Sequence, residues 1–184
     1  MGLDPMALVY IGLGSNLADP YGQVQAGIQA LGGLAGTSLR ARSWLYATAP
    51  VGPIEQPDYV NAVVALETLR APLDLLSGLQ RIESRHGRAR DGSRWGPRIL
   101  DLDLLVWEGC QLALPGLTLP HPEIRHRAFV LVPMADIAPL DLLIPGQGRL
   151  DELLHACPRQ GITRIMTPPP RGLGSAAARP LSCC

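Results

Sequence analysis

The sequence contains no lysine, because all sixteen of its basic side chains are arginine. This excludes a phosphate-binding P-loop of the Gly-Lys-Ser/Thr type and any Schiff-base chemistry on a lysine amine. Positive charge in a functional site therefore has to come from arginine. The planar guanidinium of arginine suits two-point contacts with phosphate oxygens.

Several other signals are also missing. The four cysteines include no C-x-x-C pair, so neither a zinc site nor a disulfide framework is indicated, and we expect a reducing compartment. No apolar run is long enough to span a bilayer, and the N-terminus lacks the regions of a signal peptide. The formal charges sum to zero, which points to neither a nucleic-acid nor a membrane partner. We therefore expect a cytoplasmic protein.

The pattern of apolar residues predicts one mixed domain. Short apolar runs bounded by Gly and Pro predict strands, and apolar residues at i, i+4 and i+7 predict helices. The predicted elements are a strand over 7–13, a helix over 19–33, strands over 38–46 and 59–69, a helix over 72–87, a strand over 99–106, and helices within 128–137 and near 150–156. The first six follow the split β-α-β order of ferredoxin-like folds. We therefore predict an α/β (α+β) single domain with an antiparallel sheet and helices packed on it.

The composition changes near the C-terminus. Residues 167–184 consist mainly of Pro, Gly, Ala and Ser, with almost no core-forming side chains. Such a segment cannot bury enough apolar surface to fold. We therefore predict that residues 1–166 form the domain and that residues 167–184 form a disordered tail.

The most informative local pattern is an Asp-x-Asp pair in the strand predicted over 99–106. Because side chains alternate between the faces of a strand, Asp101 and Asp103 share one face. The opposite face is then apolar and predicted to be core, with Leu100, Leu102, Leu104 and Val106. Two neighbouring carboxylates repel unless protonated or bridged by cations, and oxygen ligands without His or Cys suit Mg²⁺. Taken alone, the pair also fits two ordinary aspartates on a solvent-facing strand.

Positive charge is concentrated just before this pair. Residues 81–98 contain six arginines and two acidic residues. A basic segment beside two carboxylates is what a metal-bound polyphosphate needs from its site. The pattern favours a functional role for Arg88, Arg90 and Arg98, and a solvated surface role for Arg81, Arg85 and Arg94.

The segment Arg94-Trp95-Gly96-Pro97-Arg98, followed by Asp101-Leu102-Asp103, resembles the signature of the 6-hydroxymethyl-7,8-dihydropterin pyrophosphokinases of folate biosynthesis. Other motifs of that family occur in the same order, from about Val9 to about Ala156. They are Gly14-Ser15-Asn16, Pro50-Val51-Gly52-Pro53, Gln56-Pro57-Asp58-Tyr59-Val60-Asn61, Gln80-x-x-Glu83-x-x-x-Gly87-Arg88-x-Arg90, Pro120-His121-Pro122, Arg127-Ala128-Phe129 and Ile137-Ala138-Pro139. The resemblance implies a kinase-type transferase that moves the terminal pyrophosphate of ATP to the hydroxymethyl group of the pterin and releases AMP.

The resemblance also implies which residues form the site. Two Mg²⁺ ions would be held by Asp101 and Asp103, and ATP would be the co-substrate. The catalytic set would be Arg88, Arg98, Asp101 and Asp103. The nucleotide contacts would be Gln80, Glu83, Arg88, Arg90, Trp95, Arg98, Leu104, His121 and Arg127. The pterin contacts would be Thr48, Val51, Tyr59, Asn61, Trp95 and Phe129.

Three of these residues would recognise the flat pterin ring. Tyr59 and Phe129 would lie on its two faces, and Asn61 would bind its hydrogen-bonding edge. Without the family, a lone Phe129 at the start of an apolar helix is more often a core residue, and Tyr59 and Asn61 also fit the packed start of a strand. Trp95 would close over the site and exclude water. We expect a monomer, since no interface pattern stands out.

Two other functions are weighed against this one. A nucleotide-sugar transferase also binds metal through Asp-x-Asp, but the short chain and the lack of a Rossmann glycine pattern count against it. A ferredoxin-like module that binds RNA would expose aromatic residues on a basic sheet. The aromatic content of 4% and the zero net charge count against that module.

Overall fold

The computed structural model describes residues 6–50, 56–87, 99–158 and 161–165. Within these residues the order of strands and helices up to residue 107 follows the prediction, except that two strands replace the one predicted over 38–46. In chain order the elements are β1 (Ala7–Ser15), α1 (Pro20–Gly32), β2 (Thr37–Arg42), β3 (Tyr46–Thr48), β4 (Tyr59–Thr68), α2 (Pro72–Arg85), β5 (Asp101–Trp107), β6 (Leu112–Leu114), β7 (Leu117–Leu119), the 3-10 helix η1 (Ile124–His126), α3 (Ala128–Ala135), β8 (Leu143–Ile144), β9 (Gly148–Arg149), α4 (Leu150–Ala156) and β10 (Ile162–Arg164).

A six-stranded antiparallel sheet forms the centre of the fold. Its strands follow the order β10-β3-β4-β1-β5, and β2 also pairs with β4. β1 is therefore central, and it is flanked by β4 on one side and β5 on the other. This order, with α1 and α2 in the two crossovers, confirms the predicted ferredoxin-like α+β fold.

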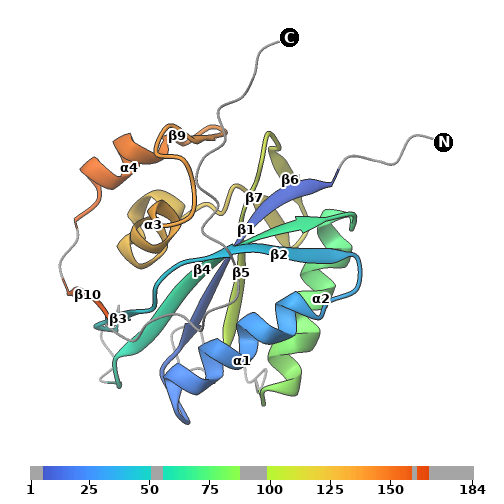
Figure 1. Cartoon of the computed structure of the whole chain (residues 1–184). Coiled ribbons are helices and arrows are strands. Elements are labelled where there is room, and N and C mark those ends of the chain that lie inside the picture. Colours follow the sequence, from blue (N-terminus) through green and yellow to red (C-terminus); the bar gives the residue numbers. More distant parts are fainter. Residues whose placement is uncertain (1–5, 51–55, 88–98, 159–160, 166–184) are drawn as a thin grey trace.

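Helices cover both faces of the sheet. In Figure 1, α1 and α2 lie on one side and α3 and α4 lie on the other. Each side has its own buried cluster of apolar side chains. We call the cluster under α1 and α2 the first core; its sheet residues include Val9, Ile11, Leu13, Ala62, Val64, Leu66, Leu102 and Leu104. We call the cluster under α3 and α4 the second core; its sheet residues include Tyr10, Val63, Ala65, Leu105 and Val106.

The two crossover helices begin where their local sequence indicates. Pro20 and Pro72 each occupy a first-turn position, where the missing proline N–H costs nothing. The Asp19 side chain accepts a hydrogen bond from the N–H of Gly22 at 3.2 Å and so caps α1. The buried stripes that hold these helices on the sheet are Val24, Ile28 and Leu31 on α1, and Leu75, Leu79 and Ile82 on α2.

The single strand predicted over 38–46 is wrong, because the structure has two strands there, β2 and β3. Between them the N–H of Ser43 still donates to the carbonyl of Val63 at 2.9 Å, but the N–H of Val63 donates to the side-chain hydroxyl of Ser43 at 2.9 Å. The N–H of Trp44 donates to the carboxylate of Asp136 at 3.1 Å. Side chains thus take the place of main-chain partners here, and the strand is interrupted.

A bulge in β5 corrects the predicted apolar face. Tyr10 pairs with Val106 and Ile11 pairs with Leu104, so Leu105 is an extra residue between them. An extra residue reverses the alternation of side chains beyond it. Leu104 therefore belongs to the first core as predicted, whereas Val106 belongs to the second core, together with Leu105.

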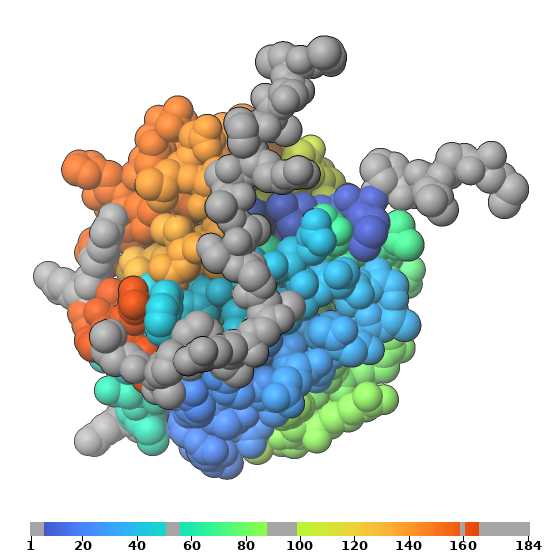
Figure 2. Space-filling model, in the orientation of Figure 1, coloured from blue at the N-terminus to red at the C-terminus, as the bar shows by residue number. Residues whose placement is uncertain are grey.

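The helices predicted within 128–137 and near 150–156 are present as α3 and α4, whereas the short strands β6 to β9 were not predicted and lie outside the central sheet. β6 and β7 form one hairpin and β8 and β9 form another. Figure 2 shows the C-terminal helices, in orange, and the N-terminal helices, in blue and green, on opposite sides of the face in view. None of the described helices combines the length and the apolar character needed to cross a bilayer.

Candidate active site

Asp101 and Asp103 lie on β5 and point to the face of the sheet that α3 covers. Both side chains are half-buried. An oxygen of Asp103 accepts a hydrogen bond from the guanidinium of Arg127, just before α3, at 2.7 Å. The predicted shared face of the two aspartates is thus present, and a positively charged side chain lies on it.

Two glycines of the central strand lie directly opposite the two aspartates. Gly12 pairs with Asp103 and Gly14 pairs with Asp101. Glycine is unfavourable inside a strand and often marks a place where another group comes close to the backbone. β1 therefore carries no side chain of its own at these two positions on this face; the Leu105 side chain lies over Gly12, and the Asn61 side chain lies beside Gly14.

These glycines were not predicted as site residues. The first strand was predicted to end at Leu13, whereas β1 continues to Ser15 and so includes Gly14. The signal was a Gly-x-Gly pattern with the same two-residue spacing as Asp-x-Asp. Its meaning depends on the register of β1 with β5, which the sequence alone does not give.

Asn61 lies on the other side of Gly14, on β4. Its side-chain amide donates a hydrogen bond to the hydroxyl of Thr48 at 2.8 Å, and both side chains are buried. A methyl group added to Gly14 would come within 3.0 Å of the Asn61 side-chain oxygen and 3.8 Å of the Tyr59 ring. The three predicted pterin contacts Thr48, Tyr59 and Asn61 are therefore grouped next to the bare strand.

His121 is held next to Asp103 by the bulge in β5. The main-chain N–H of His121 donates to the carbonyl oxygen of Leu105 at 2.7 Å. Its ring nitrogen Nε2 lies 4.0 Å from a carboxylate oxygen of Asp103, which is too far for a direct hydrogen bond. Burial lowers the pKa of His121, although the charge of Asp103 acts in the opposite direction.

Phe129 lies in the first turn of α3, two residues after Arg127. The guanidinium carbon of Arg127 is 5.7 Å from the centre of the Phe129 ring, within the range of a cation–π contact. Phe129 is half-buried and packs partly against the second core. The start of α3 thus brings one residue of the predicted nucleotide set and one of the predicted pterin set close together.

Three predicted nucleotide contacts lie elsewhere. Gln80 and Glu83 are on α2, on the opposite side of the sheet from α3. Glu83 is almost fully buried, and its carboxylate accepts a hydrogen bond from the N–H of Leu102, the residue between the two aspartates, at 2.8 Å. Leu104 is buried in the first core, so a nucleotide contact there would fall to its main chain.

Five predicted site residues lie outside the described residues. Four of them belong to the segment 88–98, which connects α2 to β5 in the sequence. Their roles stay predictions. They are Val51, Arg88, Arg90, Trp95 and Arg98.

The donor set of the aspartate pair fits Mg²⁺. Mg²⁺ commonly binds proteins through one or two carboxylates and takes its remaining ligands from water and substrate phosphates. Within the described part of the chain, no group of three or more His, Cys, Asp or Glu side chains could hold a metal by itself. Asp101 and Asp103 supply the carboxylate part of such a ligand set.

Sequence comparison finds close relatives. The family model for 7,8-dihydro-6-hydroxymethylpterin-pyrophosphokinase (HPPK) matches residues 10–139. A 2-amino-4-hydroxy-6-hydroxymethyldihydropteridine pyrophosphokinase from Pseudomonas aeruginosa is 54% identical over 157 residues, covering 85% of this chain and 96% of that protein. A protein of the same name from Haemophilus influenzae is 45% identical over 149 residues, covering 81% of this chain and 92% of that protein.

Solved structures share the fold. A crystal structure of wild-type Plasmodium falciparum HPPK-DHPS with pteroate superposes with a TM-score of 0.64 at 13% identity, covering 84% of this chain and 43% of that one. The A437G variant with SDX-DHP gives a TM-score of 0.62 at 14% identity, covering 83% of this chain and 46% of that one. This chain therefore spans less than half the length of those proteins.

Proposed function

The chain belongs to the 7,8-dihydro-6-hydroxymethylpterin-pyrophosphokinase family and is an ATP-using pyrophosphokinase of folate biosynthesis, and on this basis we propose how its residues share the reaction. The terminal pyrophosphate of ATP is transferred to the hydroxymethyl oxygen of 6-hydroxymethyl-7,8-dihydropterin, and AMP leaves. The observation that carries the assignment is the placement of Asp101 and Asp103 opposite Gly12 and Gly14.

On the phosphate side of the site, the aspartates and Arg127 act together. Asp101 and Asp103 would hold Mg²⁺, which would neutralise charge on the ATP phosphates. Arg127, which binds Asp103 at 2.7 Å, keeps that carboxylate in place and offers its remaining N–H groups to phosphate oxygens. His121 is a further phosphate contact close to Asp103.

On the pterin side, the ring lies over the bare part of β1. Asn61 presents its side-chain oxygen there, because its amide nitrogen is bound to Thr48. An acceptor in that position matches the N–H donors on the edge of a pterin. Tyr59 and Phe129 provide the aromatic surfaces for the two faces of the ring. The hydroxymethyl group would then point along β1 towards the aspartates.

The reaction needs no covalent intermediate on the protein. Residues that hold both substrates in line can supply much of the rate by removing the entropy of their encounter. Arg88 and Arg98 would neutralise charge on the transferring group, Arg90 would assist them, and Trp95 would close over the substrates. Gln80, Glu83 and Leu104 complete the proposed nucleotide set.

We propose that the enzyme is a monomer, because no interface pattern stands out in the sequence. The expected compartment is the cytoplasm, where ATP and a reduced pterin are both available. A gel-filtration experiment on the purified protein tests the first of these proposals. A dimer that stays intact on dilution would contradict it.

One assay tests the proposed reaction. The protein is incubated with Mg²⁺, ATP and the hydroxymethyl dihydropterin, and the nucleotide product is identified by chromatography. We expect AMP, formed only when the pterin is present. Production of ADP would indicate transfer of a single phosphoryl group, and no turnover with a correctly folded protein would contradict the proposed function.

A further inference from the structure

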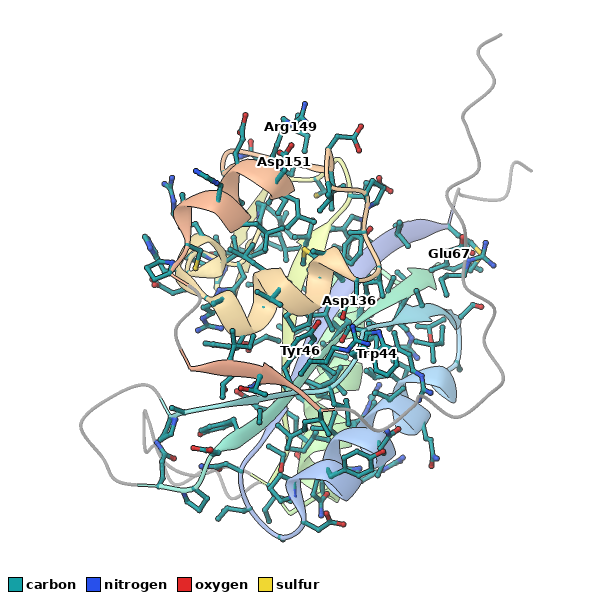
Figure 3. All side chains as sticks on the ribbon, turned by 60° about the vertical axis from the view of Figure 1, so that its left-hand side comes forward. Trp44, Tyr46, Glu67, Asp136, Arg149 and Asp151 are labelled. Atoms are coloured by element: carbon teal, nitrogen blue, oxygen red, sulfur yellow. The ribbon has the colours of Figure 1, made fainter. Side chains whose placement is uncertain are left out.

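Asp136, at the C-terminal end of α3, binds the strand region that borders the pterin side of the site. Its carboxylate accepts hydrogen bonds from the hydroxyl of Tyr46, at 2.9 and 3.1 Å to its two oxygens, and from the N–H of Trp44 at 3.1 Å. Figure 3 shows Asp136 at the end of the helix, directed at Tyr46 and Trp44. None of these three residues belongs to the proposed reaction.

This cluster is next to Asn61. Tyr46 pairs directly with Asn61 across β3 and β4, and its side chain is buried. On the outer side, the guanidinium carbon of Arg164, on β10, lies 3.9 Å from the centre of the Trp44 ring. The strand segment that receives Asp136 is therefore fixed by β4 on one side and by β10 on the other.

α3 is held on the sheet by its buried residues Val130, Leu131 and Met134 and by polar contacts at its two ends. It has eight residues, and a helix this short is marginal without tertiary packing. Pro133 lies inside it and has no N–H to donate to the carbonyl of Phe129, four residues earlier, so the helix lacks one of its own hydrogen bonds at that point. Side chains tie α3 down at both ends, through Arg127 to Asp103 and through Asp136 to Tyr46 and Trp44.

We propose that Asp136 is a positioning residue for pterin binding, which fixes the C-terminal end of α3 on β3 and thereby sets Phe129 at the correct distance from Asn61 and Tyr59. The inference rests on the proposed function, in which Phe129 covers one face of the pterin ring. Loss of the Asp136 contacts lets the helix shift, and a small displacement of Phe129 is enough to weaken stacking on the ring.

The test compares KM for the pterin, KM for ATP and kcat in three single variants. Asp136→Asn keeps the size of the side chain but removes its charge and one acceptor, and Tyr46→Phe removes only the hydroxyl. Asp151→Asn is the matched control, because it makes the same change at the exposed Arg149–Asp151 ion pair (2.8 Å), which Figure 3 shows far from the cluster.

We expect Asp136→Asn to raise the KM for the pterin about tenfold, with the KM for ATP within about twofold of the wild-type value. Tyr46→Phe should change the same parameter by a smaller factor, because Trp44 still binds Asp136. Asp151→Asn should leave all three parameters unchanged. Melting temperatures are measured in parallel, so that each variant is assayed well below its unfolding transition.

Two further variants separate this inference from the proposed function. If Asp136 acts through Phe129, the double variant Asp136→Asn/Phe129→Leu should bind the pterin no more than about twofold more weakly than Phe129→Leu alone. If the increases in the KM for the pterin caused by the two single substitutions instead multiply in the double variant, the inference is overturned. So would lower melting temperatures for Asp136→Asn and Tyr46→Phe with an unchanged KM for the pterin. An unchanged KM for the pterin in Phe129→Leu would instead contradict the proposed function.

Discussion

The two faces of the sheet differ in how far their apolar character extends. The face under α1 and α2 is apolar along its whole length, through Val9, Ile11 and Leu13 on β1. The face under α3 and α4 is apolar around Tyr10, which pairs with Ala65 and Val106. Further along β1 the same face carries Gly12, between Asp103 and the buried Val63, and then Gly14, between Asp101 and Asn61.

The face under α1 and α2 therefore contributes mainly to stability, whereas the face under α3 and α4 also carries the residues of the candidate site. Each glycine inside a strand costs about 0.5–1 kcal/mol relative to alanine, and it buries no side chain. The face under α1 and α2 compensates with an uninterrupted core. The other face has fewer apolar contacts at one end, where Asp101, Asp103 and Asn61 lie next to the glycines of β1.

Replacement of either aspartate should have the largest effect on activity. Asp103→Asn and Asp101→Asn each remove a charged metal ligand from a half-buried position, so we expect kcat to fall about a thousandfold. The melting temperature should change little. Steady-state kinetics and thermal unfolding check this prediction, with Asp151→Asn as the control. Near-normal kcat in both variants would remove the metal assignment.

Truncation of a side chain in the first core should have the opposite effect, lowering stability and leaving activity nearly unchanged. Leu79 on α2 is fully buried, and Leu79→Ala should lower the free energy of unfolding by about 2–5 kcal/mol. Kinetic constants measured well below the melting temperature should stay close to wild type. Leu73→Ala, at a 45% exposed position on the same helix, should be nearly neutral in the same denaturant titrations. A raised KM for the pterin in Leu79→Ala, with an unchanged free energy of unfolding, would contradict the contrast between the two faces.

The two glycines allow the contrast to be tested within one strand. Gly14→Ala places a methyl group 3.0 Å from the Asn61 oxygen, and Asn61 is held by Thr48, so we expect the KM for the pterin to rise about tenfold. Gly12→Ala instead meets the Leu105 side chain at 3.3 Å. Because Leu105 is core, that variant should lose about 1 kcal/mol of stability. Kinetics and denaturant unfolding of both variants are compared, and identical behaviour would contradict the distinction.

The smallest expected effect concerns the two tyrosines buried on the α3 side of the sheet. Burial raises the pKa of Tyr10 to about 12, and burial together with the Asp136 hydrogen bond raises the pKa of Tyr46 to about 12. A pKa raised on folding contributes stability that is complete below the ordinary pKa of about 10 and is lost as the pH rises through about 12.

Absorbance at alkaline pH measures this effect. In the wild-type protein, two of the four tyrosines should ionise only near pH 12. In Tyr46→Phe only one such late ionisation should remain, and the decline of stability between pH 10 and 12 should be less steep. Loss of the Tyr46 signal near pH 10 instead of near pH 12 would contradict the raised pKa of Tyr46.

Much of the fold could be predicted because its signals are local. Asp19 and Pro20 mark the start of α1, and Asp19 caps the helix by accepting a hydrogen bond from the N–H of Gly22, only three residues further along the chain. The interruption between β2 and β3 could not be predicted in this way. It depends on a hydrogen bond between Trp44 and Asp136, residues 92 positions apart in the chain.

The candidate site shows the same division. Strand alternation was enough to place Asp101 and Asp103 on one face, since both precede the bulge. It gave the wrong face for Val106, which follows the bulge. The importance of Gly12 and Gly14 also depends on pairing, because only the register of β1 with β5 shows that they lie opposite the aspartates.

The bulge at Leu105 makes the length of β5 as important as its composition. A substitution in this strand changes one contact. Deletion of Leu105 would leave Leu104 and Val106 opposite Ile11 and Tyr10, as they already are, but it would remove a buried side chain of the second core and the carbonyl that holds His121 beside Asp103. The loss of this one residue would thus disturb the second core and the candidate site together.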